Sequence, residues 1–441
     1  MKELEEYQAT LDWIKQQNAE VHVFVKETPL VELTQWSGLS SESGLKHISG
    51  NFFSIHGLIS MTNGLHHSQP IILQPEYGIL GFVSTLVNDR LYLLTQAKIE
   101  PGNVNYVQIS PTVQATKSNY SQVHKGRVPY YLDYFIGVKK GTIVYDSLQS
   151  EQGSRFYAKR NRNMVLYVEN YDEVPVLPGF KWVSLETLRE LMKLPNIVNM
   201  DARTVISGIT PNLLCDIKSK HPKCSTRQDT NSTQAARNKT LSRLSQYISF
   251  SSYQRDIVPL NQLREWQVTG DKIQHLSGDY FEVIGVQVQI GNREVTQWDQ
   301  PMIKPAHPGL CACLIRQFEG RQELLLKLQI ECGNRDYAEY GPTVQCLDLN
   351  YRTQSNKTYP FIEEIINARQ SEIVYDAILS EEGGRFYQDQ NRYMLVRVNN
   401  AIELPSEDYI WVSLDDIYQM IPYGNIFNIQ LRSLVSVIPF N

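Results

Sequence analysis

The segment IVYDSLQSEQGSRFYAKRNRNM (Ile143–Met164) decides the organisation of the chain, because it returns 230 positions later as IVYDAILSEEGGRFYQDQNRYM (Ile373–Met394). IEPGNVNYVQISPTVQATKSNY (Ile99–Tyr120) likewise matches IECGNRDYAEYGPTVQCLDLNY (Ile330–Tyr351) at an offset of 231, without a gap. A repeat of this length indicates a duplicated domain and not a solenoid. Further pairs of blocks keep the same order: His47–Leu58 with His275–Val286, Gln69–Val83 with Gln300–Leu314, and Asn196–Ile209 with Asn425–Ile438.

The repeat predicts two homologous domains, residues 1–214 and 246–441. Each has about 200 residues, which is enough to bury a core of its own. Between them, residues 215–245 are polar, with seven Lys or Arg against two Asp. We predict that this stretch is an exposed basic linker.

Within each copy the pattern is that of an α+β fold, a mixed sheet with flanking helices. Segments rich in β-branched and aromatic residues, such as 52–60 and 280–290, predict strands. SLETLRELMKL (184–194) and SLDDIYQMI (413–421) predict short helices with a serine N-cap.

The composition excludes several classes of protein. Forty-two Lys and Arg against 47 Asp and Glu give a net charge of -5, which disfavours general attraction to nucleic acid or anionic lipid. No run approaches the ~18 apolar residues of a membrane helix. The acidic, amphipathic N-terminus is unlike a secretory signal, so we expect a cytoplasmic protein.

The six cysteines are too sparse for a disulfide scaffold, and the repeat argues against a metal site. Cys311 and Cys313 correspond to Leu80 and Phe82 in the first copy, so these positions favour apolar volume. Structural zinc normally needs four ligands. We therefore expect buried thiols and no metal.

Positions that are polar in both copies serve either the fold or a ligand. Arg155 and Arg385 each follow a Gly-rich turn, a common way to offer a guanidinium and backbone N–H groups to a diphosphate. For Arg162, Arg392, Arg203 and Arg432 we favour buried ion pairs with carboxylates such as Asp146 and Asp376. Trp36 and Trp266, ahead of the first strands, either pack or stack on a nucleobase.

Several long motifs, among them Gln108–Arg127, Leu148–Met164 and Asn292–Pro305, resemble the NDP-hexose 2,3-dehydratases. The resemblance runs from about Trp36 to the C-terminus, omitting the linker. It implies tandem Nudix-like domains, a homodimer, no metal or other cofactor, and action on dTDP-4-keto-6-deoxy-D-glucose in deoxysugar biosynthesis. In agreement, the chain has no Gly-x5-Glu-x7-Arg-Glu-x-x-Glu-Glu Nudix box.

The resemblance also implies nucleotide-sugar contacts in both copies. Lys327 stands where many members carry Arg, which puts bidentate phosphate contact in doubt there. The predicted substrate-binding residues of the first copy are Trp36, Gln114, Ala115, Thr116, Lys117, Ser118, Asn119, Tyr120, Ser154 and Arg155. Those of the second copy are Trp266, Lys327, Thr343, Val344, Gln345, Cys346, Asn350, Gly383, Gly384, Arg385 and Tyr387, the last as a hydrogen-bond donor.

The expected reaction needs a base for the proton on sugar carbon 3, donors for the enolate, and an acid for the hydroxyl on carbon 2. Lys117 stands opposite Asp348, so we predict one catalytic pocket and one that only binds. We place the chemistry in the second half, with Glu382 and Tyr351 as catalytic residues, because only that half offers the Glu381-Glu382 pair. His47 and His275 are weaker base candidates.

No redox cofactor is required, and no Gly-x-Gly-x-x-Gly loop is present. A downstream 3-ketoreductase is the expected pathway partner, because the diketo product is unstable. The alternative is a nucleotide-sugar-binding protein without catalysis; a Nudix hydrolase is disfavoured by the missing box.

Overall fold

The computed structural model describes residues 2–39, 44–62, 64–117, 128–219, 231–291, 296–346, 359–399 and 402–440. The first half contains a seven-stranded mixed sheet of order β10-β11-β6-β7-β12, with β8 on β7 and β9 on β6. β11 and β6 run parallel and the other pairs run antiparallel. Its strands are β6 (Gly78–Val87), β7 (Arg90–Ile99), β8 (Val107–Ser110), β9 (Val113–Ala115), β10 (Thr142–Ser150), β11 (Arg160–Tyr167) and β12 (Phe180–Ser184).

The second half repeats this sheet as β20-β19-β18-β23-β22, with β21 on β18 and β24 on β19. β6 and β18 are buried along most of their length, in keeping with their apolar sequences and central positions. The strands are β18 (Gly309–Phe318), β19 (Arg321–Ile330), β20 (Ala338–Gly341), β21 (Val344–Cys346), β22 (Ile373–Ser380), β23 (Gln390–Arg397) and β24 (Tyr409–Ser413).

Two five-stranded sheets join the halves by exchanging strands. β1 (Val23–Thr28) of the first half pairs antiparallel with β16 (Glu282–Ile290) of the second. β13 (Gln254–Val258) of the second half pairs in the same way with β4 (Ser54–Thr62) of the first. The remaining strands are β2 (Trp36–Ser37), β3 (Leu45–His47), β5 (Leu65–Leu73), β14 (Trp266–Val268), β15 (Lys272–His275) and β17 (Gln297–Lys304). The predicted boundaries therefore do not separate two independent bodies.

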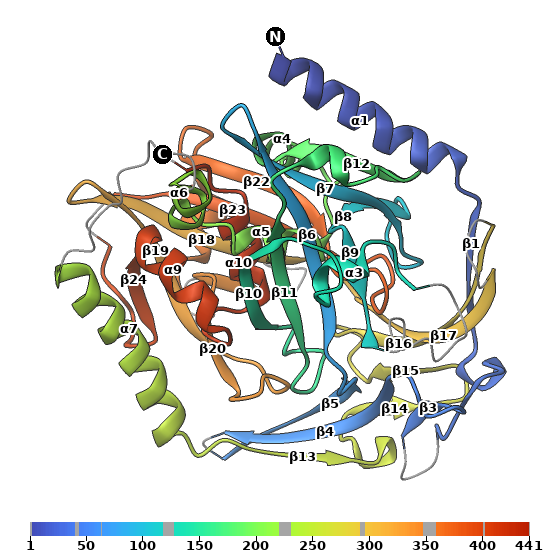
Figure 1. Cartoon of the computed structure of the whole chain (residues 1–441). Coiled ribbons are helices and arrows are strands. Elements are labelled where there is room, and N and C mark those ends of the chain that lie inside the picture. Colours follow the sequence, from blue (N-terminus) through green and yellow to red (C-terminus); the bar gives the residue numbers. More distant parts are fainter. Residues whose placement is uncertain are drawn as a thin grey trace.

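A pair of short helices lies between the two large sheets (Figure 1). α5 (Met200–Ser207) packs against α10 (Ile429–Ser436), and one hydrophobic core runs through both halves. Arg203 and Arg432 are fully buried here, each donating to a carbonyl of the other half, Ser380 O and Ser150 O. The other helices are α3 (Leu132–Phe135), α4 (Leu185–Leu191), α6 (Pro211–Ser219), α8 (Ile362–Ile366) and α9 (Leu414–Met420), with 3-10 turns η1 (Leu30–Glu32), η2 (Tyr171–Glu173), η3 (Leu260–Gln262) and η5 (Ile421–Tyr423).

The two longest helices, α1 (Lys2–Glu20) and α7 (Asn231–Phe250), lie on opposite flanks of the molecule (Figure 1). α7 covers residues 231–245 of the predicted linker, and one face of this helix packs against the protein while many of its other described side chains are exposed. It packs on α9, β20 and β24, with Leu244 buried and Leu241, Tyr247 and Ile248 against the core. These apolar side chains are spaced as on one helix face, a pattern hidden by the polar residues around them.

The serine caps and two of the four predicted arginine–aspartate pairings are confirmed. Ser184 and Ser413 cap α4 and α9, accepting from the N–H of Thr187 and Asp416. Arg162 and Arg392 pair with Asp146 and Asp376, each with an Nε–carboxylate distance of 2.8 Å, but these pairs are partly exposed and not buried as predicted. Arg203 and Arg432 instead donate to backbone carbonyls. The five described cysteines are free thiols. Among the described residues, no helix is long and apolar enough to cross a membrane.

Candidate active site

A cavity of about 730 Å3 lies over the large sheet of the first half. Strands β6, β7 and β9 supply one side through Leu80, Gln96, Lys98 and Gln114. The second half closes it with Trp298, Asp299 and Gln300 of β17 and with Glu382, Gly384 and Arg385. The cavity is therefore composite, and neither half contains all of its residues.

The loop from Ser380 to Tyr387 reaches this cavity because it is anchored on the first half. The N–H of Gly102 donates to Gly383 O at 2.8 Å, and the N–H of Gln388 donates to Gly102 O at 2.7 Å. Within the loop, the N–H of Gly384 donates to Glu382 Oε1 at 3.0 Å. A Cβ on Gly384 would lie 2.3 Å from the same oxygen, so only glycine leaves the carboxyl group in place.

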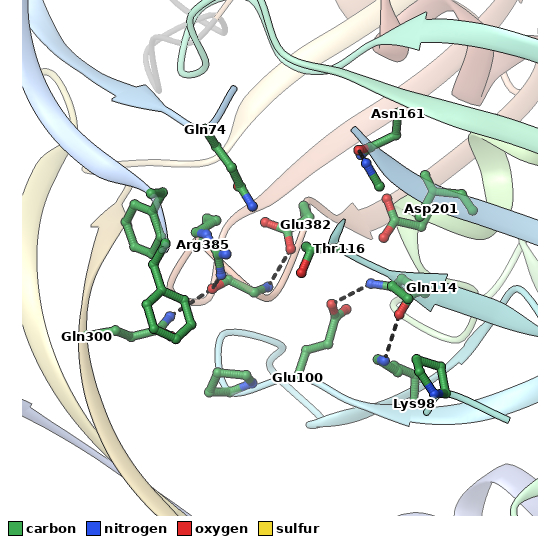
Figure 2. A pocket seen from close by; sticks show the side chains of 18 of the residues that line it. Gln74, Lys98, Glu100, Gln114, Thr116, Asn161, Asp201, Gln300, Glu382 and Arg385 are labelled. Atoms are coloured by element: carbon green, nitrogen blue, oxygen red, sulfur yellow. Dashed lines mark hydrogen bonds between the residues drawn. The ribbon is translucent and has the colours of Figure 1, made fainter. Parts of the chain in front are cut away.

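Five carboxyl groups line the cavity, those of Glu100, Glu151, Asp201, Asp299 and Glu382. Those of Glu382, Asp201 and Glu100 face the same space (Figure 2). Burial, and after it the charge of Glu100, raises the pKa of Glu382 to about 8. Burial raises the pKa of Asp201 well above its usual range, with the charges of Glu151, Glu100 and Glu382 adding to the effect. Glu382 Oε2 and Asp201 Oδ1 are buried and have no hydrogen-bond partner among the described residues.

Glu100 differs from these two because amides hold its carboxylate. Gln114 Nε2 donates to it at 2.8 Å and Asn103 Nδ2 at 3.3 Å. Of these three groups, side-chain amides hold the carboxylate of Glu100, whereas burial favours the neutral forms of Glu382 and Asp201. Groups of this kind can exchange protons with a ligand near neutral pH.

Three cations accompany the carboxyl groups. The Arg385 guanidinium lies 4.3 Å above the ring of Phe53 and donates to Gly384 O at 2.9 Å. Lys159 donates to Glu76 O, and Lys98 Nζ donates to Gln114 O at 3.2 Å. Burial lowers the pKa values of Arg385 and Lys159, while nearby carboxylates oppose that effect. The positive charge suits an anionic ligand or a developing enolate.

The repeat supplies a comparison for each of these groups. The scaffold is retained: Gln345 donates to Glu331 as Gln114 does to Glu100, both at 2.8 Å. Arg155 lies over Phe281 as Arg385 does over Phe53. Four ionisable side chains of the cavity are not retained: Glu382, Asp201, Lys98 and Lys159 correspond to Gln152, Gln430, Gln329 and Asp389.

Of the predicted binding residues, Trp36, Gln114, Ala115, Thr116, Gly384 and Arg385 line the cavity, as does the predicted catalytic Glu382. Trp36 also packs, because its Nε1 donates to Asp299 O at 2.9 Å. His47 lines the cavity too, but His275 does not. Glu382 therefore lies over the first-half sheet, which corrects the expectation that it marks a pocket of the second half.

A second set of predicted residues lies at the repeat-related positions and not in the cavity. Trp266 Nε1 donates to Ser68 O at 2.7 Å, and Thr343 is hydrogen-bonded to Leu325 O and Leu314 N within the sheet. Burial lowers the pKa of Lys327, whose amine lies over Tyr409. This set comprises Ser154, Arg155, Trp266, Lys327, Thr343, Val344, Gln345 and Cys346.

The remaining predicted residues fall into two groups. Lys117 is exposed and Gly383 packs on Asn103, while Tyr387 lies near Lys304, outside the cavity lining. Ser118, Asn119, Tyr120, Asn350 and the predicted catalytic Tyr351 lie outside the described residues. Among the described residues, no group of three or more His, Cys, Asp or Glu is arranged to hold a metal ion.

Sequence reasoning missed Lys98, Glu100, Lys159 and Asp201. For two of them the signal was a difference between the copies, since Asp201 corresponds to Gln430 and Lys159 to Asp389 inside the matched blocks, whereas Glu100 is kept as Glu331. Positions kept in both copies mark the shared scaffold. Positions whose charge differs between the copies indicate a function that only one of the two repeat-related sites has.

Comparisons with known proteins cover both repeats of the chain. The family model for NDP-hexose 2,3-dehydratase matches residues 7–209 and again residues 237–438. A dTDP-4-dehydro-6-deoxy-alpha-D-glucopyranose 2,3-dehydratase from Saccharopolyspora spinosa is 40% identical over 96% of this chain and 89% of its own length. Enzymes of the same name from Streptomyces violaceoruber and Amycolatopsis orientalis are each 36% identical over 97% of the chain, covering 95% and 88% of their own lengths.

Proposed function

The chain belongs to the NDP-hexose 2,3-dehydratase family, and from this premise we propose that it is a hydro-lyase acting on dTDP-4-keto-6-deoxy-glucose. It removes water across carbons 2 and 3 and yields a dTDP-3,4-diketo-2,6-dideoxyhexose for deoxysugar biosynthesis. The support is the match of both repeats to the family and the name shared by three relatives of nearly full length.

We place the reaction in the cavity that holds Glu382, on one observation. The groups able to move protons there, Glu382 and Asp201, are replaced by Gln152 and Gln430 at the repeat-related positions, where an amide cannot exchange a proton in the same way. The catalytic site is then made by a first-half sheet and a second-half loop.

The roles follow from the charges. The Glu382 carboxylate takes the proton from carbon 3, which the 4-ketone acidifies, and the electron pair moves into the enolate. Lys98 contributes positive charge to stabilise that enolate. Asp201, neutral because its pKa is raised, gives its proton to the departing hydroxyl, so that the bond to carbon 2 breaks and water leaves. Loss of water leaves a double bond between carbons 2 and 3 that carries the hydroxyl on carbon 3. This enol takes a proton at carbon 2 and gives up its hydroxyl proton, so that carbon 3 becomes the second carbonyl of the diketone.

Four further expectations are part of the proposal. Each repeat has a Nudix-like fold, and the protein works as a homodimer in the cytoplasm. Its unstable product is consumed by a 3-ketoreductase. Light scattering of the purified protein tests the dimer, and trapping of the product by an added ketoreductase tests the sequence of steps.

The test of function is incubation with dTDP-4-keto-6-deoxy-glucose in deuterated water, followed by NMR and mass spectrometry. We expect loss of substrate and release of dTDP from the unstable diketone. Saturable binding with the substrate fully retained would instead identify a nucleotide-sugar-binding protein. The same assay without added metal, after treatment with a chelator, tests the expectation that no metal takes part.

A further inference from the structure

Gln300 links the second-half sheet to the loop that carries Glu382. It lies on β17 and is 8% exposed, and both polar atoms of its side chain are engaged. Nε2 donates to Gly384 O at 2.8 Å, and Oε1 accepts from Trp298 Nε1 at 3.1 Å. Gly384 in turn donates from its N–H to Glu382 Oε1 at 3.0 Å (Figure 2).

The loop is therefore held on two sides. On the first-half side, Gly102 and Gly383 join by a backbone hydrogen bond. On the second-half side, Gln300 fixes Gly384. Glu382 Oε2 has no hydrogen-bond partner among the described residues, so the bond from the Gly384 N–H to Oε1 orients the carboxyl group. The position of the carboxyl then depends on Gln300, which does not touch it.

The repeat provides the same arrangement without the carboxyl group. Gln69 Nε2 donates to Ser154 O at 2.6 Å, and Gln69 Oε1 lies 3.1 Å from His67 Nε2. The loop that Gln69 holds carries Gln152 in place of Glu382. Substituting Gln300 or Gln69 therefore removes equivalent hydrogen bonds from the fold, but only the substitution of Gln300 affects the loop that carries Glu382.

We propose that Gln300 is a positioning residue for the dehydration, holding Gly384 so that the Glu382 carboxyl group points at the sugar. The inference rests on the proposed role of Glu382. A carboxylate displaced by about 1 Å from its productive position loses up to about 100-fold in rate. It also loses the Gly384 hydrogen bond, which favours its ionised form, so its pKa rises further.

The experiment compares Gln300→Met with Gln69→Met, which removes the equivalent bonds from the other loop. Thermal melts of the two variants should agree. Gln300→Met should lower kcat about 10- to 100-fold with KM changed by less than about threefold, and should move the acidic limb of the pH profile to higher pH. Gln69→Met should leave kcat and the profile unchanged within about twofold.

Equal losses of kcat in the two variants, or an unmoved pH profile in Gln300→Met, would show that Gln300 only supports the fold. The double variant with Glu382→Gln separates a second alternative. If Gln300 acts through Glu382, adding Gln300→Met to Glu382→Gln changes kcat by less than about twofold; if Gln300 acts on the sugar directly, the losses multiply, and the proposal fails. Full activity of Glu382→Gln alone would also overturn it, whereas substrate consumption by the wild type tests the dehydratase function separately.

Discussion

Gln152 donates from Nε2 to the carboxylate of Glu381 at 2.9 Å. Gln152 is the repeat-related counterpart of Glu382, and Glu381 is the direct neighbour of Glu382 in the chain. At this position of the repeat, Gln152 makes a hydrogen bond between the halves, whereas Glu382 places a carboxyl group in the cavity. Both copies keep the scaffold, but only one of the two repeat-related sites carries the proposed acid and base.

The pH dependence of the wild-type enzyme follows from the raised pKa of Glu382. As the base, Glu382 must be ionised, and its pKa is about 8. We therefore expect kcat/KM to rise with pH and to level off above about pH 8. Initial rates between pH 6 and 9 measure this. A profile that is flat across this range contradicts the assignment.

Glu100 is expected to set part of that pKa. Its charge follows burial among the causes of the shift at Glu382, so Glu100→Gln should move the acidic limb to lower pH by about one unit or less. Glu331→Gln is the matched control, because Gln345 holds Glu331 as Gln114 holds Glu100. The control should keep the wild-type profile. An equal shift in both variants would point to a general effect on the fold.

Gly384→Ser introduces the residue that the other loop carries as Ser154. The new Cβ would lie 2.3 Å from Glu382 Oε1, so the carboxyl group must move away from its present position. We expect kcat to fall about 10- to 100-fold while the melting temperature changes by only a few degrees. Assay and thermal melt of the same preparation check this. Unchanged kcat would mean that the carboxyl position is not critical.

Glu339 makes stability depend on pH. Burial raises its pKa to about 7, above the value near 4.5 of an unfolded glutamate, so the folded state binds the proton more tightly. Stability is then greatest below pH 4.5 for this group and falls as the pH rises through about 7. The counterpart of Glu339 is Gln108, which accepts from Ser380 Oγ much as Glu339 accepts from Ser150 Oγ.

We therefore expect Glu339→Gln to reduce the drop in melting temperature between pH 5.5 and 8.5. The difference should correspond to about 1–3 kcal/mol in the free energy of unfolding. Calorimetry of both proteins at the two pH values measures it. An unchanged pH dependence would mean that Glu339 is ionised in the folded state at both values.

The sequence predicted much of the architecture, because a duplication exposes shared blocks, and strand patterns and serine caps are local signals. It could not predict the exchange of β1 and β13 between halves, since nothing local distinguishes pairing within a half from pairing across it. For the same reason Glu382 was expected in a second-half pocket, although contacts such as Gly102 with Gly383 carry it to the first half. The helix α7 was missed because polar residues outnumber the few apolar ones that face the core.

Tertiary contacts are also needed to decide which of the two repeat-related sites is the catalytic one. The sequence alone shows that Asp201 and Gln430 differ, but not that Asp201 and Glu382 face one cavity from different halves. The motifs shared by the two copies predicted substrate binding by Arg155 as well as by Arg385, because both copies keep the guanidinium and its aromatic partner.

The most direct test of the account is the turnover of dTDP-4-keto-6-deoxy-glucose by Glu382→Gln, which gives this position the amide of Gln152. The account predicts a loss of at least about 100-fold in kcat, with substrate binding by calorimetry and the melting temperature close to wild type. Turnover within about threefold of the wild type would contradict the placement of the reaction in the cavity that the two halves share.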